Sequence, residues 1–197
     1  MKREEILGRI RSANSGRENP EHPGPFVSGL VPEGADPVEV FCERFEAVGG
    51  ETVRVADRAS AREWLERFMA DFDSVSFGVH VPADLKIVSG GAPSAAKVGV
   101  SWASAAIAET GSIALSSRDG RRVQLLPPTH VVLVESDSIA PTLVDAMSRW
   151  RDDLPAAIGL HSGPSKSADI GQVMVQGVHG PGRLIAVVID GRSSPAR

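Results

Sequence analysis

Over residues 37–79, apolar residues recur with helical spacing in two segments and with strand-like spacing in two others, and this pattern predicts a series of helices and strands. The predicted order is helix, strand, helix, strand, over residues 37–48, 51–56, 60–72 and 74–79. Gly49 and Gly50 end the first helix, and Ser60 with Glu63 forms an S-x-x-E capping box that opens the second. Such alternation is typical of an α/β domain with a mostly parallel sheet covered by helices.

The remaining pattern is more varied. Two apolar runs flank Glu109-Thr110-Gly111, which favours a hairpin over 105–115, although a short helix over 102–108 is an alternative. The other predicted strands are 98–101, an edge strand over 121–128, a buried strand over 130–135, and 183–189. Helical spacing predicts a helix over 139–150 and another that begins at Ser165 or Ser167 and ends at Gly177.

The N-terminal segment differs from the rest. Residues 2–12 have helical spacing of apolar side chains, and residues 13–37 are rich in proline and glycine. We therefore expect a helix and a Pro-rich arm over residues 1–35, an α/β domain over 36–190 and a tail over 191–197. The arm has too few apolar residues for a core of its own, so it is a plausible docking element for another protein.

Composition and charge exclude several classes of function. Hydrophobic residues make up 42% of the chain and the net charge is -4, so attraction to nucleic-acid phosphates is not expected. No apolar run is long enough to span a membrane, and no signal peptide is recognisable, so we expect a soluble, cytoplasmic protein. Cys42 is the single cysteine. Because iron–sulfur clusters need four ligands and no metal-binding spacing of histidines occurs, we expect no cofactor and no metal in this chain.

Three polar, glycine-containing segments could carry chemistry. The first is Glu109-Thr110-Gly111, where a carboxylate exposed at a tight turn could act as a base, a nucleophile or a hydrogen-bond acceptor. Thr110 and Gly111 would fix the turn and contribute to a ligand site. An ordinary surface turn is the alternative.

The second segment is Ser162-Gly163-Pro164-Ser165-Lys166-Ser167, which leads into the predicted helix. Backbone N–H groups at a helix N-terminus, together with hydroxyl groups and Lys166, would bind an anion such as a carboxylate or phosphate. The alternative is a well-capped helix, because serine is a good N-cap and Asp169 already complements the helix dipole.

The third segment, Gly177-Val178-His179-Gly180, places a histidine in a constrained loop. His179 could transfer a proton or bind a ligand, with Gly177 and Gly180 shaping the site, or it could be an ordinary surface side chain. Since ligands bind beyond the carboxyl ends of strands in open parallel sheets, we expect all three segments to meet at one cleft. His130, which precedes a buried strand, is expected to be structural.

The sequence resembles the lactate utilization protein C family, whose members contain the LUD domain. The resemblance rests on A-I-A-E-T-G-S-I-A-L with the following L-L-P-P-T-H-V-V-L-V, on S-G-P-S-K-S-A-D-I, and on G-V-H-G-P, which together span most of residues 98–189. Family members often have T-G-A-D where this chain has Ser101 to Ser104, and Arg-Thr where it has Lys166-Ser167. The first difference removes a carboxylate.

The resemblance implies a three-layer, NagB/RpiA/CoA transferase-like fold, as in glucosamine-6-phosphate deaminase, ribose-5-phosphate isomerase and CoA transferases. It also implies a role beside two iron–sulfur partner proteins in the oxidation of L-lactate to pyruvate. This chain would then be a non-redox subunit that binds a small anion. Alternatively, it is an enzyme by itself on a carboxylate, CoA ester or sugar phosphate, with Glu109 as the catalytic group.

Overall fold

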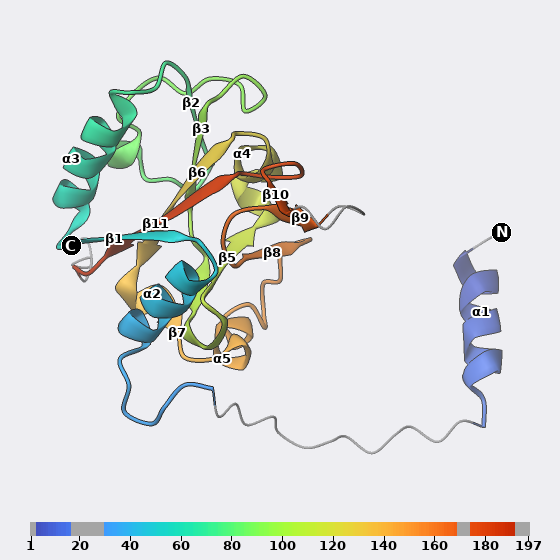
Figure 1. Ribbon diagram of the computed structural model, residues 1–197. Coiled ribbons are helices and arrows are strands. Elements are labelled where there is room, and N and C mark those ends of the chain that lie inside the picture. Colours follow the sequence, from blue (N-terminus) through green and yellow to red (C-terminus); the bar gives the residue numbers. More distant parts are fainter. Residues whose placement is uncertain (1–2, 17–29, 169–173, 192–197) are drawn as a thin grey trace, which may run out of the picture.

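The computed structural model describes residues 3–16, 30–168 and 174–191, and its centre is a five-stranded parallel sheet (Figure 1). The order across this sheet is β1-β11-β6-β3-β2. The strands are β1 (Glu51–Val55), β2 (Val75–Phe77), β3 (Val98–Trp102), β6 (Thr129–Glu135) and β11 (Arg183–Ile189). All four pairings are parallel, so the predicted α/β class with a mostly parallel sheet is confirmed.

The two central strands are buried on both faces. In β6, Val131 and Leu133 pack with α3 (Arg58–Met69), whereas Val132 and Val134 pack with α2 (Pro37–Ala47). The continuous apolar runs of β6 and β11 follow from this arrangement, because successive side chains of a strand point to opposite faces.

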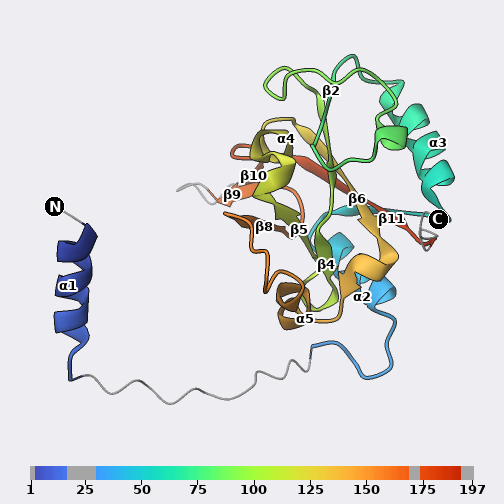
Figure 2. The same cartoon turned by 180° about the vertical axis from the view of Figure 1, so that it is seen from behind.

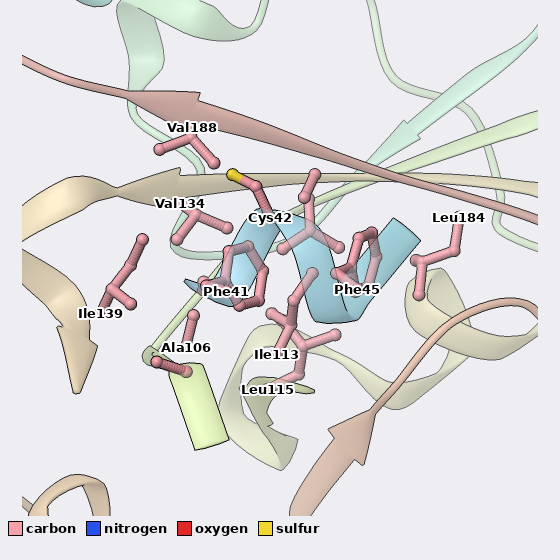
Figure 3. Close-up of a cluster of buried hydrophobic side chains, with 14 residues drawn as sticks. Phe41, Cys42, Phe45, Ala106, Ile113, Leu115, Val134, Ile139, Leu184 and Val188 are labelled. Carbon is pink, nitrogen blue, oxygen red and sulfur yellow. The ribbon is translucent and has the colours of Figure 1, made fainter. Parts of the chain in front are cut away.

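Helix α2 lies between the central sheet and a second sheet (Figure 3). Phe41 and Phe45 are fully buried and stack with their ring centroids 5.5 Å apart. Cys42 is buried beside them, and burial raises the pKa of its thiol. The helix begins as the sequence suggests, because Asp36 accepts a hydrogen bond from the Val38 N–H and proline occupies the first turn.

The second sheet has the order β7-β4-β5-β8 and carries α5 (Leu143–Ser148) (Figure 2). Its strands are β4 (Ala105–Ile107), β5 (Ser112–Ser116), β7 (Ile139–Ala140) and β8 (Ile158–His161). Strands β4 and β5 form the predicted hairpin. Short 3-10 turns are η1 (Ala83–Leu85), η2 (Ala108–Thr110), η3 (Ser117–Asp119) and η4 (Ser136–Ser138).

Four local predictions were wrong. The supposed edge strand over 121–128 is a helix, α4 (Arg121–Leu125), and the helix over 139–150 is divided into β7 and α5. Helix α3 begins after Asp57, whose carboxylate accepts the Ser60 N–H, so Ser60 is not its N-cap. Instead of the predicted helix, β9 (Lys166–Ala168) and β10 (Met174–Gln176) pair as antiparallel strands, and residues 169–173 of that prediction lie outside the described residues.

The N-terminal helix is present as α1 (Arg3–Asn14), and none of its residues is buried. Most of the predicted Pro-rich arm, residues 17–29, lies outside the described residues, as does the end of the predicted tail. The described end of the arm contacts the domain, where Arg44 donates to the Leu30 carbonyl and Val31 packs on the core. None of the described helices combines the length and apolar character needed to cross a membrane.

Candidate functional site

A pocket with a volume of about 530 Å³ lies beyond the carboxyl ends of β2 and β3. We call it the strand-end pocket. Its lining comes from the loops after both strands and from the second sheet and the segment after α5. The lining residues are His80, Trp102, Ala103, Ser104, Ser116, Arg118, Arg149, Trp150, Asp153 and Pro155. Its position is the usual one for a ligand in an open parallel sheet.

Two arginines and one carboxylate, Asp153, line this pocket. Arg118 forms a bidentate pair with Asp153, with N–O distances of 2.5 and 2.8 Å. This hydrogen-bonded pair holds the pKa of the Asp153 carboxyl below its usual value. Arg149 donates to the carbonyls of Ser138 and Asp137, at 2.9 and 3.3 Å. A guanidinium has five N–H donors, so both arginines retain donors for a ligand.

The loop after β2 is fixed by a buried carboxylate. Asp119 is 1% exposed, and its Oδ1 accepts the backbone N–H of His80 at 2.8 Å. The carbonyl of Asp119 accepts the N–H of Val79 at 3.1 Å. The imidazole Nδ1 of His80 lies 3.4 Å from the same Oδ1, and the ring is half-exposed at the pocket. The carboxylate therefore positions both the backbone and the side chain of His80.

A second, smaller pocket brings together two of the three segments predicted from sequence. This loop pocket has a volume of about 190 Å³ and includes Ser162, Gly163, Ser165, His179 and Gly180. Backbone hydrogen bonds join the two loops: Ser165 donates to Pro181, and Gly177 donates to Ser165. The pocket lies near the amino ends of β6 and β11, because Gly182 donates to Pro128 just before these strands. The cleft expected at the carboxyl ends is therefore not this one.

The physical basis for an anion at this loop is weaker than predicted. Residues 166–168 are extended and pair with β10, so no helix N-terminus faces the loop pocket. Lys166 donates to the Val48 carbonyl, and neither Lys166 nor Ser167 lines the pocket. Anion binding by Ser162, Gly163, Ser165, Lys166 and Ser167 stays a prediction.

The first segment, Glu109-Thr110-Gly111, lines neither pocket. Glu109 was expected to be exposed, but it is buried, with its side chain turned to α5. Its Oε1 accepts the Leu143 N–H at 2.6 Å, and Arg44 donates to its backbone carbonyl. Thr110 is exposed, and Gly111 adopts a left-handed conformation with φ 58° against the backbone of Arg44. The geometry gives Glu109 a structural role at the start of α5, and its catalytic role stays a prediction.

Two histidines lie between the sheets. His130 is fully buried, its Nε2 lies 3.0 Å from the Ser101 hydroxyl, and its ring centroid is 6.0 Å from that of His161. Burial, with a smaller contribution from His161, lowers the pKa of His130 to about 3. Burial also lowers the pKa of His161, which lines the loop pocket. Both rings are therefore neutral at pH 7, and a structural role for His130 agrees with its burial.

Sequence reasoning missed the main residues of the strand-end pocket. His80, Arg118 and Arg149 come from three separate segments, and none belongs to a spaced motif. Two signals were present: His80 directly follows a predicted strand, and Trp102 and Ser104 belong to the segment that differs from T-G-A-D. Both of these differing positions line the pocket. Among the residues that the structure describes, no three His, Cys, Asp or Glu side chains gather as metal ligands would.

Comparison with known proteins agrees with this architecture. Residues 93–189 match the LUD domain family. Lactate utilization protein C 1 of Bacillus mycoides is 36% identical over 104 residues, which is 49% of this chain and 44% of that protein. Lactate utilization protein C of Anoxybacillus flavithermus is 38% identical over 100 residues, 49% of this chain and 46% of that protein. The match therefore spans slightly less than half the length of these curated relatives.

A solved structure shows the same fold. The crystal structure of a DUF162 family protein from Deinococcus radiodurans superimposes with a TM-score of 0.60 at 20% identity. It covers 78% of this chain, and this chain covers 96% of it. The likeness extends well beyond the segment matched in sequence. Residues 93–189 thus match the LUD domain, this part of the chain is similar to lactate utilization protein C, and the fold as a whole is that of the DUF162 protein.

Proposed function

We propose that this chain is a non-redox component of a lactate-utilization system and binds a small carboxylate in the strand-end pocket. The observation that supports this most is the presence of Arg118 and Arg149 in a pocket at the carboxyl ends of β2 and β3. Guanidinium groups bind carboxylates through paired N–H donors. The names of the relatives suggest lactate or its oxidation product, pyruvate, as the carboxylate.

The proposal also assigns the electron transfer to other proteins. Oxidation of lactate to pyruvate releases two electrons, which a redox cofactor must accept. With a single, buried cysteine, this chain has too few thiolates for an iron–sulfur cluster of its own. Iron–sulfur partner proteins, as the family resemblance implies, would carry the electrons. A cytoplasmic location is part of the same proposal.

Carboxylate binding is expected to weaken at least about tenfold when both arginines are replaced, because charge-assisted hydrogen bonds contribute roughly 1.5–3 kcal/mol each. The variant is Arg118→Gln with Arg149→Gln, and the measurement is isothermal titration calorimetry with lactate and pyruvate. Arg151→Gln is the matched control, because Arg151 is an exposed arginine two residues from Arg149 that does not line the pocket. Equal affinity in the double variant and the control would contradict the proposed site.

The partner proposal has its own test. The purified chain is expected to reduce no dye with lactate, whereas the chain co-expressed with iron–sulfur proteins encoded beside it is expected to form a complex that does. Deletion of residues 1–35 should weaken this complex if the arm is the docking element. Lactate-dependent dye reduction by the isolated chain would refute the non-redox assignment, and an unchanged complex after deletion would refute only the role of the arm.

A further inference from the structure

His80 and Asp119 lie together at the end of the loop that follows β2. The imidazole Nδ1 is 3.4 Å from Asp119 Oδ1, and the backbone N–H of His80 donates to the same oxygen. His80 also belongs to the lining of the strand-end pocket, and its side chain is half-exposed. A buried carboxylate thus lies behind a histidine whose ring is half-exposed at a candidate ligand site.

The chain packs closely around the carboxylate of Asp119. Gly78 passes so near that a Cβ on this residue would lie 2.3 Å from Asp119 Oδ2. That oxygen is buried and has no hydrogen-bond partner among the described residues. Burying a carboxylate in this way is costly unless a positive charge compensates it. The imidazole Nδ1 of His80 faces the other oxygen of this carboxylate, where an N–H group would stabilise it.

The geometry also selects one imidazole nitrogen for a ligand. Because Nδ1 faces the carboxylate, the favoured neutral tautomer carries its proton there. Nε2, on the other side of the ring, then has a free lone pair, and no described residue hydrogen-bonds to it. A carboxylate that orients a histidine in this way also stabilises the imidazolium after the ring accepts a proton.

We propose that His80 and Asp119 form a proton-transfer pair that serves a 2-oxo acid in the strand-end pocket. This inference rests on the proposed carboxylate site, where Arg118 and Arg149 would hold the acid group. With a 2-oxo acid, His80 Nε2 takes a proton from the carbon next to the carbonyl. The C–H bond breaks, an N–H bond forms, and the electron pair stays on the ligand as an enolate. Return of a proton from Nε2 restores the ligand, so no oxidant is needed.

The test is exchange of the methyl protons of pyruvate in deuterated water, followed by proton NMR. The wild-type chain is expected to accelerate this exchange, and His80→Gln to lose about 100-fold or more, the usual contribution of a positioned base. Calorimetry should show that His80→Gln still binds pyruvate within about threefold, because the arginines remain. Added imidazole is expected to restore part of the exchange to His80→Ala.

Asp119 is a positioning residue, so its test includes a spectroscopic signature. Nitrogen-15 NMR of the imidazole in wild-type protein is expected to show the tautomer protonated at Nδ1. Asp119→Asn should change this tautomer balance and slow exchange, whereas Asp73→Asn, which removes an exposed carboxylate before the other end of β2, should change neither. A purely structural role for Asp119 would leave the tautomer and the exchange rate of a folded variant unaltered.

The outcomes separate the two proposals. If wild-type protein binds pyruvate but does not accelerate exchange, or if His80→Gln exchanges as fast as wild type, the proton-transfer pair is overturned and the carboxylate site stands. If wild-type protein binds neither lactate nor pyruvate, the carboxylate site is overturned, and the proton-transfer pair with it. Loss of exchange in His80→Gln with retained binding supports both.

Discussion

Acidification is expected to remove about 2 kcal/mol of folding stability by pH 5 and about 3 kcal/mol by pH 4 through His130 alone. In the folded protein, burial lowers the pKa of His130 to about 3, whereas in the unfolded chain the pKa returns to about 6.5. Between these values the unfolded state binds more protons. The free energy of unfolding therefore rises with pH in this window. The stabilising contribution of neutral His130 is fully present above the pKa of the unfolded state and is lost as the pH falls from that value toward the pKa of the folded state.

Urea unfolding at several pH values measures this effect. The slope attributable to one proton approaches about 1.4 kcal/mol per pH unit between pH 6 and 4. Carboxylates such as Glu51 and Asp153, whose pKa values are lowered by Arg183 and Arg118, add their own loss only nearer pH 4 and below. The interval from pH 6.5 to 5 therefore isolates the histidines. Because the pKa of His161 is also lowered, His130→Gln should flatten the slope there without abolishing it. An unchanged slope in His130→Gln would contradict the assignment.

Phe45→Ala is expected to destabilise the fold by about 3–5 kcal/mol, the usual cost of removing a buried aromatic ring. Phe45 is fully buried and stacks on Phe41 between the two sheets (Figure 3). Gly50 lies directly against the ring, since a Cβ there would be 2.3 Å from Phe45 Cε1. With no side chain at Gly50 to move into the space, the cavity left by the substitution cannot easily collapse.

The measurement is the midpoint and slope of urea denaturation. Val48→Ala is the matched control, because Val48 follows the same helix but is 39% exposed, and it should cost less than about 1 kcal/mol. A loss for Phe45→Ala no larger than that of the control would show that α2 does not hold the two sheets together. A lower slope with Phe45→Ala would instead indicate a looser native state.

Periodicity predicted the central sheet well because β6 and β11 are buried on both faces and therefore appear as continuous apolar runs. The alternation of helices and strands over residues 37–79 indicated the parallel direction of β1 and β2 within this sheet. The prediction failed where local and tertiary preferences compete. Ser165 and Ser167 are good helix caps, yet residues 166–168 pair with residues 174–176 as antiparallel strands, with Gly177 at φ 80° directly after β10.

The candidate site was harder to predict than the fold for a physical reason. Glycine-containing loops are the usual candidates for a ligand site in a sequence. In the structure, however, Glu109 accepts the Leu143 N–H at the start of α5, and Gly111 packs against the backbone of Arg44. The strand-end pocket instead combines Arg118 and Arg149, which follow β5 and α5, with residues at the ends of β2 and β3 in the first sheet. The spacing of these residues along the sequence does not indicate that they lie together. Only the rule that ligands lie beyond strand ends could have pointed to His80.

The place of β11 within the central sheet has a consequence for biosynthesis. This strand is the latest in sequence of the five, yet it lies between β1 and β6, with Glu51 opposite Ile185 and Thr129 opposite Arg183. On the ribosome, β1 and β6 therefore emerge long before the strand that joins them, and each presents an unpaired, apolar edge in the meantime. Completion of the central sheet thus waits for β11, and until this strand emerges the unpaired edges of β1 and β6 are natural targets for chaperones.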